Sequence, residues 1–150
     1  MQILRTLLVA AIAAAQTFTL SDPVLVTSVV QGDAIQVAAV GRVRLQGIAA
    51  PHMTRSILAG DPLGREAVER LAGLVAHRWV RLEFAHGAHG SSSSHSAYVL
   101  LEDGTFVNAV LAREGLARVT VRGSSARERQ LLDAQASAQA MRRGIWGTSR

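Results

Sequence analysis

Histidines, acidic residues and arginines are the side chains of this 150-residue chain that could do chemistry, because it contains no cysteine and its 16 basic residues are all arginine. Without cysteine, the chain has no disulfide bond, thiolate metal ligand or cysteine nucleophile. Without lysine, it has neither Schiff-base chemistry nor a P-loop lysine for phosphate. Imidazole, carboxylate and guanidinium groups remain for metal, acid–base or phosphate chemistry.

His86 and His89 lie in a segment rich in glycine and serine, at a spacing that is compatible with metal chelation. No helix is predicted there to hold the two imidazoles in place. We therefore favour a solvated loop over a metal site for this pair.

Seven arginines accumulate between residues 118 and 150. They are Arg118, Arg122, Arg127, Arg129, Arg142, Arg143 and Arg150. A forked guanidinium group binds phosphate and carboxylate, so a basic face here would suit nucleic acid, anionic lipid or a protein. The alternative is a solvated helix face whose charge Glu128 and Asp133 partly offset. Two tryptophans and one tyrosine offer little surface for base stacking, which weakens the case for binding of single-stranded nucleic acid. We favour the solvated face and place protein contact second.

Residues 1–20 differ in character from the rest of the chain. Arg5 is followed by an apolar run over residues 6–15 that ends in small residues, as an export signal does. The run is shorter than the roughly 20 residues of a membrane span, but Phe18 and Leu20 extend it. We expect a signal peptide cleaved after Ala15, or alternatively an uncleaved membrane anchor. The protein is then exported to the periplasm or another extracytoplasmic space, either soluble or tethered.

The remaining residues, 21–150, have the size of one compact domain. Hydrophobic residues make up 49% of the sequence and charged residues 18%, which is enough apolar surface to build a core. Strands are predicted from alternation and β-branched content at residues 24–30, 34–40, 42–48, 79–84 and 97–101.

Three helices are predicted between and after these strands. Apolar residues at helical spacing favour a helix over 62–77, and Asn108 is expected to cap a helix over 109–114 that Gly115 ends. Ser124 or Ser125 is expected to cap a last helix that runs to about Arg143, after which Gly144 and Trp146 turn back onto the domain. Five short strands with a helix between the third and fourth are typical of a small closed barrel, the OB-fold. The predicted class is thus α+β, a β-barrel with about three α-helices.

Several motifs in this order resemble the staphylococcal-nuclease-like, or thermonuclease, family. They are VVQGDAIQV, VRLQGIAAPH, GREAVERLAGLV, AYVLLEDGTFVNAVLAREGLA and the terminal GIW, and they cover about residues 24–147. The resemblance implies a five-stranded OB barrel with three helices. It also implies the activity of the family's working members, which are calcium-dependent phosphodiesterases acting on DNA and RNA.

The residues that the family uses for catalysis are mostly replaced. Active members carry an aspartate, a glycine, a second aspartate and a threonine where this chain has QGDA, so Asp33 is kept and Gln31 is a substitution. The next motif contains an arginine, then an aspartate, a small residue, a proline and a glutamate. Arg44 matches the arginine, whereas Ala49 replaces the metal-binding aspartate and His52 replaces the general base.

The second catalytic arginine of the family is also missing, because Ser94 stands near its place, and residues 120–123 lack the tyrosines that cover the nucleotide. Phosphodiester hydrolysis needs an activated water, a hard cation and arginines that stabilise charge. Loss of one charge-stabilising donor costs roughly 2.7–4 kcal/mol, and several such groups are replaced here. We therefore expect a pseudo-enzyme without a metal cofactor, with calcium relevant only under the nuclease hypothesis.

Histidines offer an alternative in which the site is rebuilt around a transition metal. The resemblance places the glycine- and serine-rich loop over the pocket in which His52 replaces the glutamate. The candidate ligands are Asp33, His52, His86, His89 and His95. We favour the solvated loop, and an internal salt bridge between Arg44 and Asp33 is at least as well supported as a ligand role for either residue.

The sequence thus predicts a non-catalytic binding or accessory module whose partner is a protein. An anchor at residues 1–20 would make it a subunit of a membrane-associated complex. The alternatives are a metal-dependent phosphodiesterase and a non-catalytic nucleic-acid binder, which would show salt-sensitive phosphate contacts.

Overall fold

A computed structural model describes residues 18–52, 62–85 and 95–147. The strands of this part of the chain are β1 (Phe18–Leu20), β2 (Val24–Gln31), β3 (Ala34–Val37), β4 (Gly41–Leu45), β5 (Ile48–Ala49), β6 (Trp79–Ala85), β7 (His95–Leu101) and β8 (Arg118–Val119). The helices are α1 (Pro62–Val75), α2 (Val107–Arg113), α3 (Ala126–Ala140) and the short 3-10 helix η1 (Gly144–Trp146).

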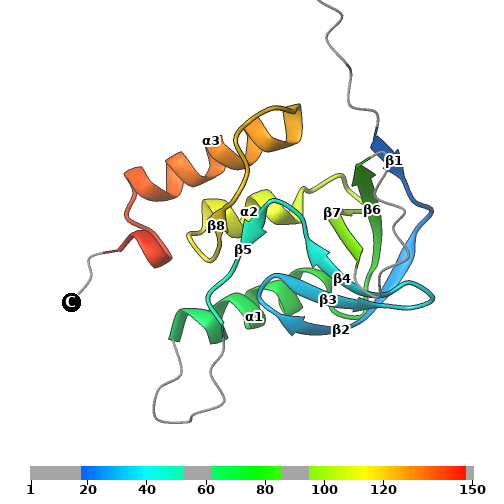
Figure 1. The fold of residues 1–150 in the computed structure, drawn as a ribbon. Helices are drawn as coiled ribbons and strands as arrows, with labels where there is room; N and C mark the ends of the chain where they lie inside the picture. Colours follow the sequence, from blue (N-terminus) through cyan, green and yellow to red (C-terminus); the bar gives the residue numbers. More distant parts are fainter. Residues whose placement is uncertain (1–17, 53–61, 86–94, 148–150) are drawn as a thin grey trace, which may run out of the picture.

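Five of the strands close into a barrel (Figure 1). β2, β3 and β4 form an antiparallel meander, β4 pairs in parallel with β7, and β7 pairs antiparallel with β6. The ring closes where β6 meets β2, at the pairs Val24↔Val80 and Leu25↔Trp79. The predicted five-stranded OB-fold barrel with three helices is therefore confirmed.

The core lies inside the barrel and beneath the helices. Alternate strand residues such as Val26, Ile35, Val43 and Leu82 are fully buried, as period-2 alternation requires. Helix α1 contributes Ala67, Leu71 and Val75 from one face, and α2 lies between α1 and α3 (Figure 1). The helix predicted over 62–77 thus forms, with its last helical residue at Val75.

Asn108 does not cap α2, so the cap predicted from the sequence is wrong. Phe106 occupies the cap position, and Asn108 lies inside the helix with no exposed surface. Its side-chain oxygen accepts a hydrogen bond from the Val99 amide at 2.9 Å, and its amide nitrogen donates to the Gln46 carbonyl at 2.8 Å. Long-range partners therefore outweigh the capping preference of asparagine at this position.

The C-terminal ends of α2 and α3 agree only in part with the prediction. α2 ends before Gly115, as predicted, and Gly115 has a φ of 71°. The last helix is shorter than predicted, because α3 ends at Ala140 rather than near Arg143. The chain turns there so that the Ile145 amide can donate to the Gly115 carbonyl at 2.8 Å, which brings Trp146 back onto the domain as expected.

Strand β1 belongs to the sheet, although residues 1–20 were expected to precede the domain. Phe18 pairs with Ala85, and its ring centroid lies 5.8 Å from that of Tyr98. The folded region thus begins at or before Phe18, while cleavage or retention of the N-terminal segment stays a prediction. Among the described residues, no helix combines the length and the apolar character needed to cross a membrane.

Candidate functional site

Asp33 lies in the turn between β2 and β3 and is held against the chain that follows β5. Gly32 makes this approach possible, because a Cβ there would lie 2.6 Å from the Ala67 Cβ and 2.8 Å from the Ala50 Cβ. The Asp33 side chain is 2% exposed, and its Oδ2 accepts a hydrogen bond from the Ala50 amide at 3.2 Å. The turn thus aims this carboxylate at a main-chain N–H group.

Arg44 is the charged neighbour of Asp33. It stands on β4 opposite Ala34, and its Nη2 lies 3.6 Å from the Asp33 Oδ2. That separation is an ion pair rather than a direct hydrogen bond. Because the Arg44 side chain is 55% exposed, its guanidinium group faces solvent while Asp33 is buried. The ion pair considered in the sequence analysis is therefore present.

The other positions that the resemblance singled out lie at the end of β2, in β5 and just after β5. Gln31 ends β2 and accepts a 3.4 Å hydrogen bond from Arg42. Ala49 lies in β5 opposite Arg118 of β8, and His52 is exposed where the chain leaves β5. Hence Asp33 is the one acidic side chain at the described family positions.

The donor set at these positions does not fit calcium. Calcium takes six to eight oxygen ligands, whereas Asp33 supplies one carboxylate that already faces an amide and a guanidinium group. Within residues 18–52, 62–85 and 95–147, no group of three or more histidine, aspartate or glutamate side chains is placed to hold a metal ion. His95 lies on β7 opposite Val43, while His86, His89 and Ser94 fall outside the described residues.

A hollow of about 370 Å³ opens beside Ala49. Its lining residues are Ala49, Ala50, Pro51, Arg118 and Ile145. The Arg118 guanidinium carbon lies 4.7 Å from the centre of the Trp146 ring, and the buried indole nitrogen of Trp146 has no hydrogen-bond partner among the described residues. These walls offer apolar contact and one cation, with no carboxylate or imidazole to act as a base.

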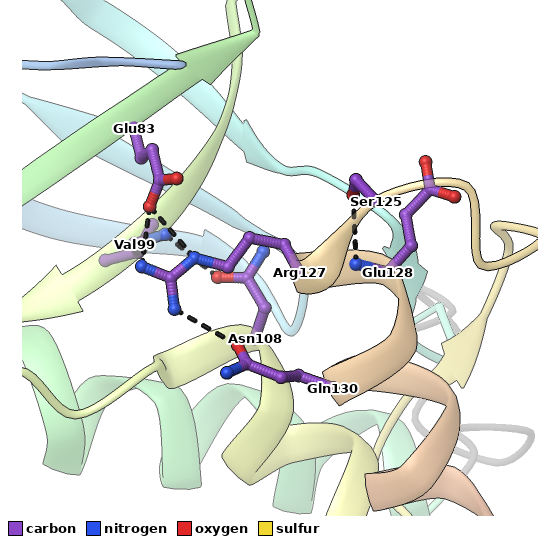
Figure 2. Close-up of polar contacts among 7 residues, drawn as sticks. All are labelled: Glu83, Val99, Asn108, Ser125, Arg127, Glu128 and Gln130. Carbon is purple, nitrogen blue, oxygen red and sulfur yellow. Dashed lines mark hydrogen bonds and ion pairs between the residues drawn. The ribbon is translucent and has the colours of Figure 1, made fainter. Parts of the chain in front are cut away.

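Arg127 is not part of a free basic face. Figure 2 shows its guanidinium group between Glu83 of β6 and Gln130 of α3. Its Nη2 lies 2.7 Å from Glu83 Oε2, and its guanidinium carbon lies 4.7 Å from the centre of the Phe106 ring. This arginine ties α3 to the barrel, a role that no local sequence pattern could have indicated.

The remaining arginines of the predicted face are exposed but do not form one patch. Arg122 and Arg129 lie at the start of α3, whereas Arg142 and Arg143 follow its end. A rise of 1.5 Å per residue separates Arg129 from Arg142 by roughly 20 Å along the helix direction. Arg143 also donates to the Arg113 carbonyl at 3.5 Å. The basic side chains at the two ends of α3 thus form two separate groups, and Arg118 lies on β8 beside Trp146.

The chain matches the family model of staphylococcal nuclease homologues over residues 42–148. The matched region runs from β4 to the residues after η1 and contains Arg44, Ala49 and His52, whereas Gln31 and Asp33 precede it. A comparison with curated proteins found no match. The family match covers most of the chain and agrees with the barrel and its helices, so the chain belongs to the family of staphylococcal nuclease homologues.

Proposed function

We propose that this staphylococcal-nuclease-like domain has kept its fold, has lost hydrolytic activity, and serves as a binding or accessory module. One observation carries the proposal, namely the surroundings of the Asp33 carboxylate. Its neighbours are the Ala50 amide, at 3.2 Å, and the Arg44 guanidinium, at 3.6 Å. No second acidic side chain stands at the described family positions.

The chemistry of phosphodiester cleavage makes this arrangement inadequate. A hard cation has to sit beside the phosphate, and a base has to activate the attacking water. Ala49 offers a methyl group where the family has a metal ligand, and His52 is an exposed imidazole where it has a glutamate. Each lost charge-stabilising group costs roughly 2.7–4 kcal/mol of transition-state stabilisation, although such losses do not simply add.

The proposed partner is a protein, and the proposed location is outside the cytoplasm. The apolar run at residues 6–15 and the small residues that end it support export. Only Gln16 and Thr17 separate Ala15 from β1, so cleavage after Ala15 would leave the first strand complete. If the segment is retained, it would hold the barrel close to a membrane as a subunit of a larger complex.

A calcium titration tests the proposal at the metal site. Isothermal titration of the purified domain with calcium is expected to show no saturable binding with a Kd of about 1 mM or tighter. A Kd of about 1 mM corresponds to a binding free energy of roughly −4.1 kcal/mol. Asp33→Asn is the matched control, because it removes the charge and keeps the shape. Saturable binding to the natural sequence that Asp33→Asn removes would contradict the proposal.

Purification of the native protein under mild conditions tests the accessory role. Mass spectrometry would define its N-terminus and the proteins that accompany it. We expect a stoichiometric protein complex without nuclease activity. A free, processed chain that cuts nucleic acid with zinc or manganese would instead support the histidine-based site, and release of bound nucleic acid by salt would support the nucleic-acid binder.

A further inference from the structure

A second hollow lies where the chain enters β6 and leaves β7, away from the turn that holds Asp33. Figure 1 shows the start of β6 and the end of β7 at the same end of the barrel. Its volume is about 410 Å³, and it shares no lining residue with the hollow beside Ala49. The lining residues are His77, Arg78, Trp79, Leu101, Glu102 and Asp103. Aromatic, apolar and charged side chains therefore meet at this end of the barrel.

Trp79 is the main apolar feature of this second hollow. It is 53% exposed, whereas Val80 and Leu82 of the same strand are completely buried. Its cross-strand partner is the half-buried Leu25, which extends the apolar surface. The other large hydrophobic residues that are exposed in the described part of the chain, Leu20, Val30 and Met141, do not line this hollow.

Two carboxylates stand beside the indole. Glu102 and Asp103 belong to the turn after β7, which the Gly104 amide closes by donating to the Leu101 carbonyl at 2.9 Å. Asp103 Oδ1 accepts a hydrogen bond from the Thr105 amide at 2.9 Å, which fixes the direction of that side chain. Hydrogen bonding from Thr105 also holds the pKa of Asp103 below its usual value, so this carboxylate is ionised at neutral pH.

The charge of this lining differs from that of the whole chain. Glu102 and Asp103 outnumber the single cation Arg78, while the chain as a whole carries a net charge of +5. Phosphate groups of nucleic acid or anionic lipid would meet two carboxylates here. A cation would find both a tryptophan face, the best aromatic partner for a cation, and opposite charge.

We propose that this second hollow is a docking site for a protein partner and receives one of its arginine or lysine side chains. The cation stacks on Trp79 and pairs with Glu102 and Asp103, while Leu101 contacts the apolar part of the side chain. Tryptophan is enriched among the residues that dominate binding at protein interfaces. The inference rests on the proposed protein partner, but it does not depend on whether the Asp33 site is catalytic.

The test uses the full domain and two synthetic octapeptides of equal length. One contains two arginines among glycines and serines, and the other contains citrulline at the same places, which keeps the shape and removes the charge. The chain has two tryptophans, so Trp79→Phe assigns the two indole N–H resonances in a nitrogen–proton NMR spectrum. We expect the arginine peptide to shift the Trp79 resonance with a Kd of about 1 mM, and the citrulline peptide and the Trp146 resonance to show no change.

Variants separate the stacking contribution from the charge contribution. Trp79→Ala is expected to weaken binding about fivefold, measured on backbone resonances around Glu102, with Trp79→Phe restoring part of it. Glu102→Gln is expected to weaken it about threefold. Met141→Ala is the matched control, because Met141 is 62% exposed and lies outside the second hollow.

Three results would overturn the proposal. Equal shifts with both peptides would remove the role of the cation. Shifts produced only by vesicles containing phosphatidylserine would identify a membrane surface instead. Shifts of the Trp79 resonance that depend on protein concentration rather than on peptide would identify a contact between copies of this chain.

Discussion

Asp33 has two candidate roles. The resemblance to the nuclease family implies a metal ligand at this position, whereas the structure shows a buried carboxylate that accepts a hydrogen bond from the Ala50 amide. Its Oδ2 accepts from the Ala50 amide, and the turn around it is packed against α1 through Gly32. A metal ligand that lacks its metal commonly destabilises a fold through charge repulsion, whereas a structural carboxylate stabilises it. The sign of a substitution therefore distinguishes the two roles.

We predict that Asp33→Ala lowers the free energy of unfolding by about 2 kcal/mol, because the buried Ala50 amide loses its acceptor. Arg44→Gln should change it by less than about 1 kcal/mol, since that guanidinium group is largely solvated. Urea unfolding followed by circular dichroism measures both. An increase in stability in Asp33→Ala would mean that the position is still a functional site.

The sequence predicted the contact partners of some single residues and missed those of others. The Asp33–Arg44 pair follows from two short motifs, and Ser125 was one of two expected caps. Asn108 was assigned to a cap because asparagine favours that position, yet its partner Gln46 lies 62 residues away. Trp79 was not singled out, although the alternation of its strand, with Val80 and Leu82 buried, could have indicated an outward indole. Contacts between distant residues leave no local pattern.

Helix α3 is joined to strand β6 of the barrel by an ion pair between Arg127 and Glu83. The Arg127–Glu83 pair, at 2.7 Å, is mostly shielded, with side-chain exposures of 25% and 12%. The Arg70–Glu114 pair between α1 and α2, at 2.8 Å, is more exposed, at 43% and 34%. The two pairs thus have similar N–O distances and different exposure to solvent.

A double-mutant cycle on each pair, with Arg→Ala and Glu→Ala, measures the difference. We predict a coupling energy of about 2 kcal/mol for Arg127–Glu83 and below about 1 kcal/mol for Arg70–Glu114. Chemical denaturation of each single and double variant supplies the energies. Equal coupling in the two cycles would contradict the claim that Arg127 anchors α3.

The start of α3 gives a prediction about pH. The Ser125 hydroxyl accepts from the Glu128 amide, and Glu128 Oε2 accepts from the Ser124 hydroxyl and from two preceding amides (Figure 2 shows the Ser125 bond). The hydrogen bond from Ser124 is the main cause that lowers the pKa of Glu128 below its ordinary value of 4.5. Because the folded pKa is depressed, the stabilisation is present above the unfolded value and is lost as the pH falls through the folded value.

Glu128→Gln should therefore destabilise the protein at pH 7, and the difference from the natural sequence should shrink below pH 4.5. Ser125→Ala is the control, with a loss of about 1 kcal/mol at both ends of this range, because the serine does not titrate. Thermal unfolding at several pH values measures both variants. A constant loss in Glu128→Gln would rule out the charged cap.

Elements with a strong repeating pattern were predicted and short ones were not. The five barrel strands and the three helices followed from alternation, helical spacing and stop signals such as Gly115. β5 and β8 have two residues each, and β1 has three, which is too short for a period to appear. The early end of α3 depends on the docking of η1 at Gly115, which is a tertiary contact.

At the level of the whole molecule, the barrel core and the Asp33 site use different residues, so the barrel can form whether or not the site is catalytic. Core residues such as Val26, Ile35 and Leu82 alternate along their strands with residues that face outward. Substitutions at the outward positions therefore leave the core packing unchanged. The fold could therefore be predicted from its repeating pattern. The site could be predicted only at the positions where the family motifs align with this sequence. Ser94, His86 and His89 lie outside the described residues.

The pairing of β1 with β6 allows a prediction about the effect of N-terminal deletions on stability. Deletion of residues 1–15 should leave the melting temperature unchanged, whereas deletion of residues 1–20 should lower the free energy of unfolding by about 1–2 kcal/mol. The longer deletion removes the β1 pairing with β6 and the Phe18–Tyr98 ring contact. Equal melting temperatures for the two truncated chains would show that β1 does not contribute to stability.

The measurement that tests the central claim most directly is hydrolysis of single-stranded DNA and of RNA in calcium, manganese and zinc, with an active family member as the positive control. We expect that the natural sequence cuts no faster than Asp33→Asn in any of the three metals. Metal-dependent cleavage by the natural sequence that Asp33→Asn abolishes would contradict it, and would show that the Asp33 site still works as a nuclease.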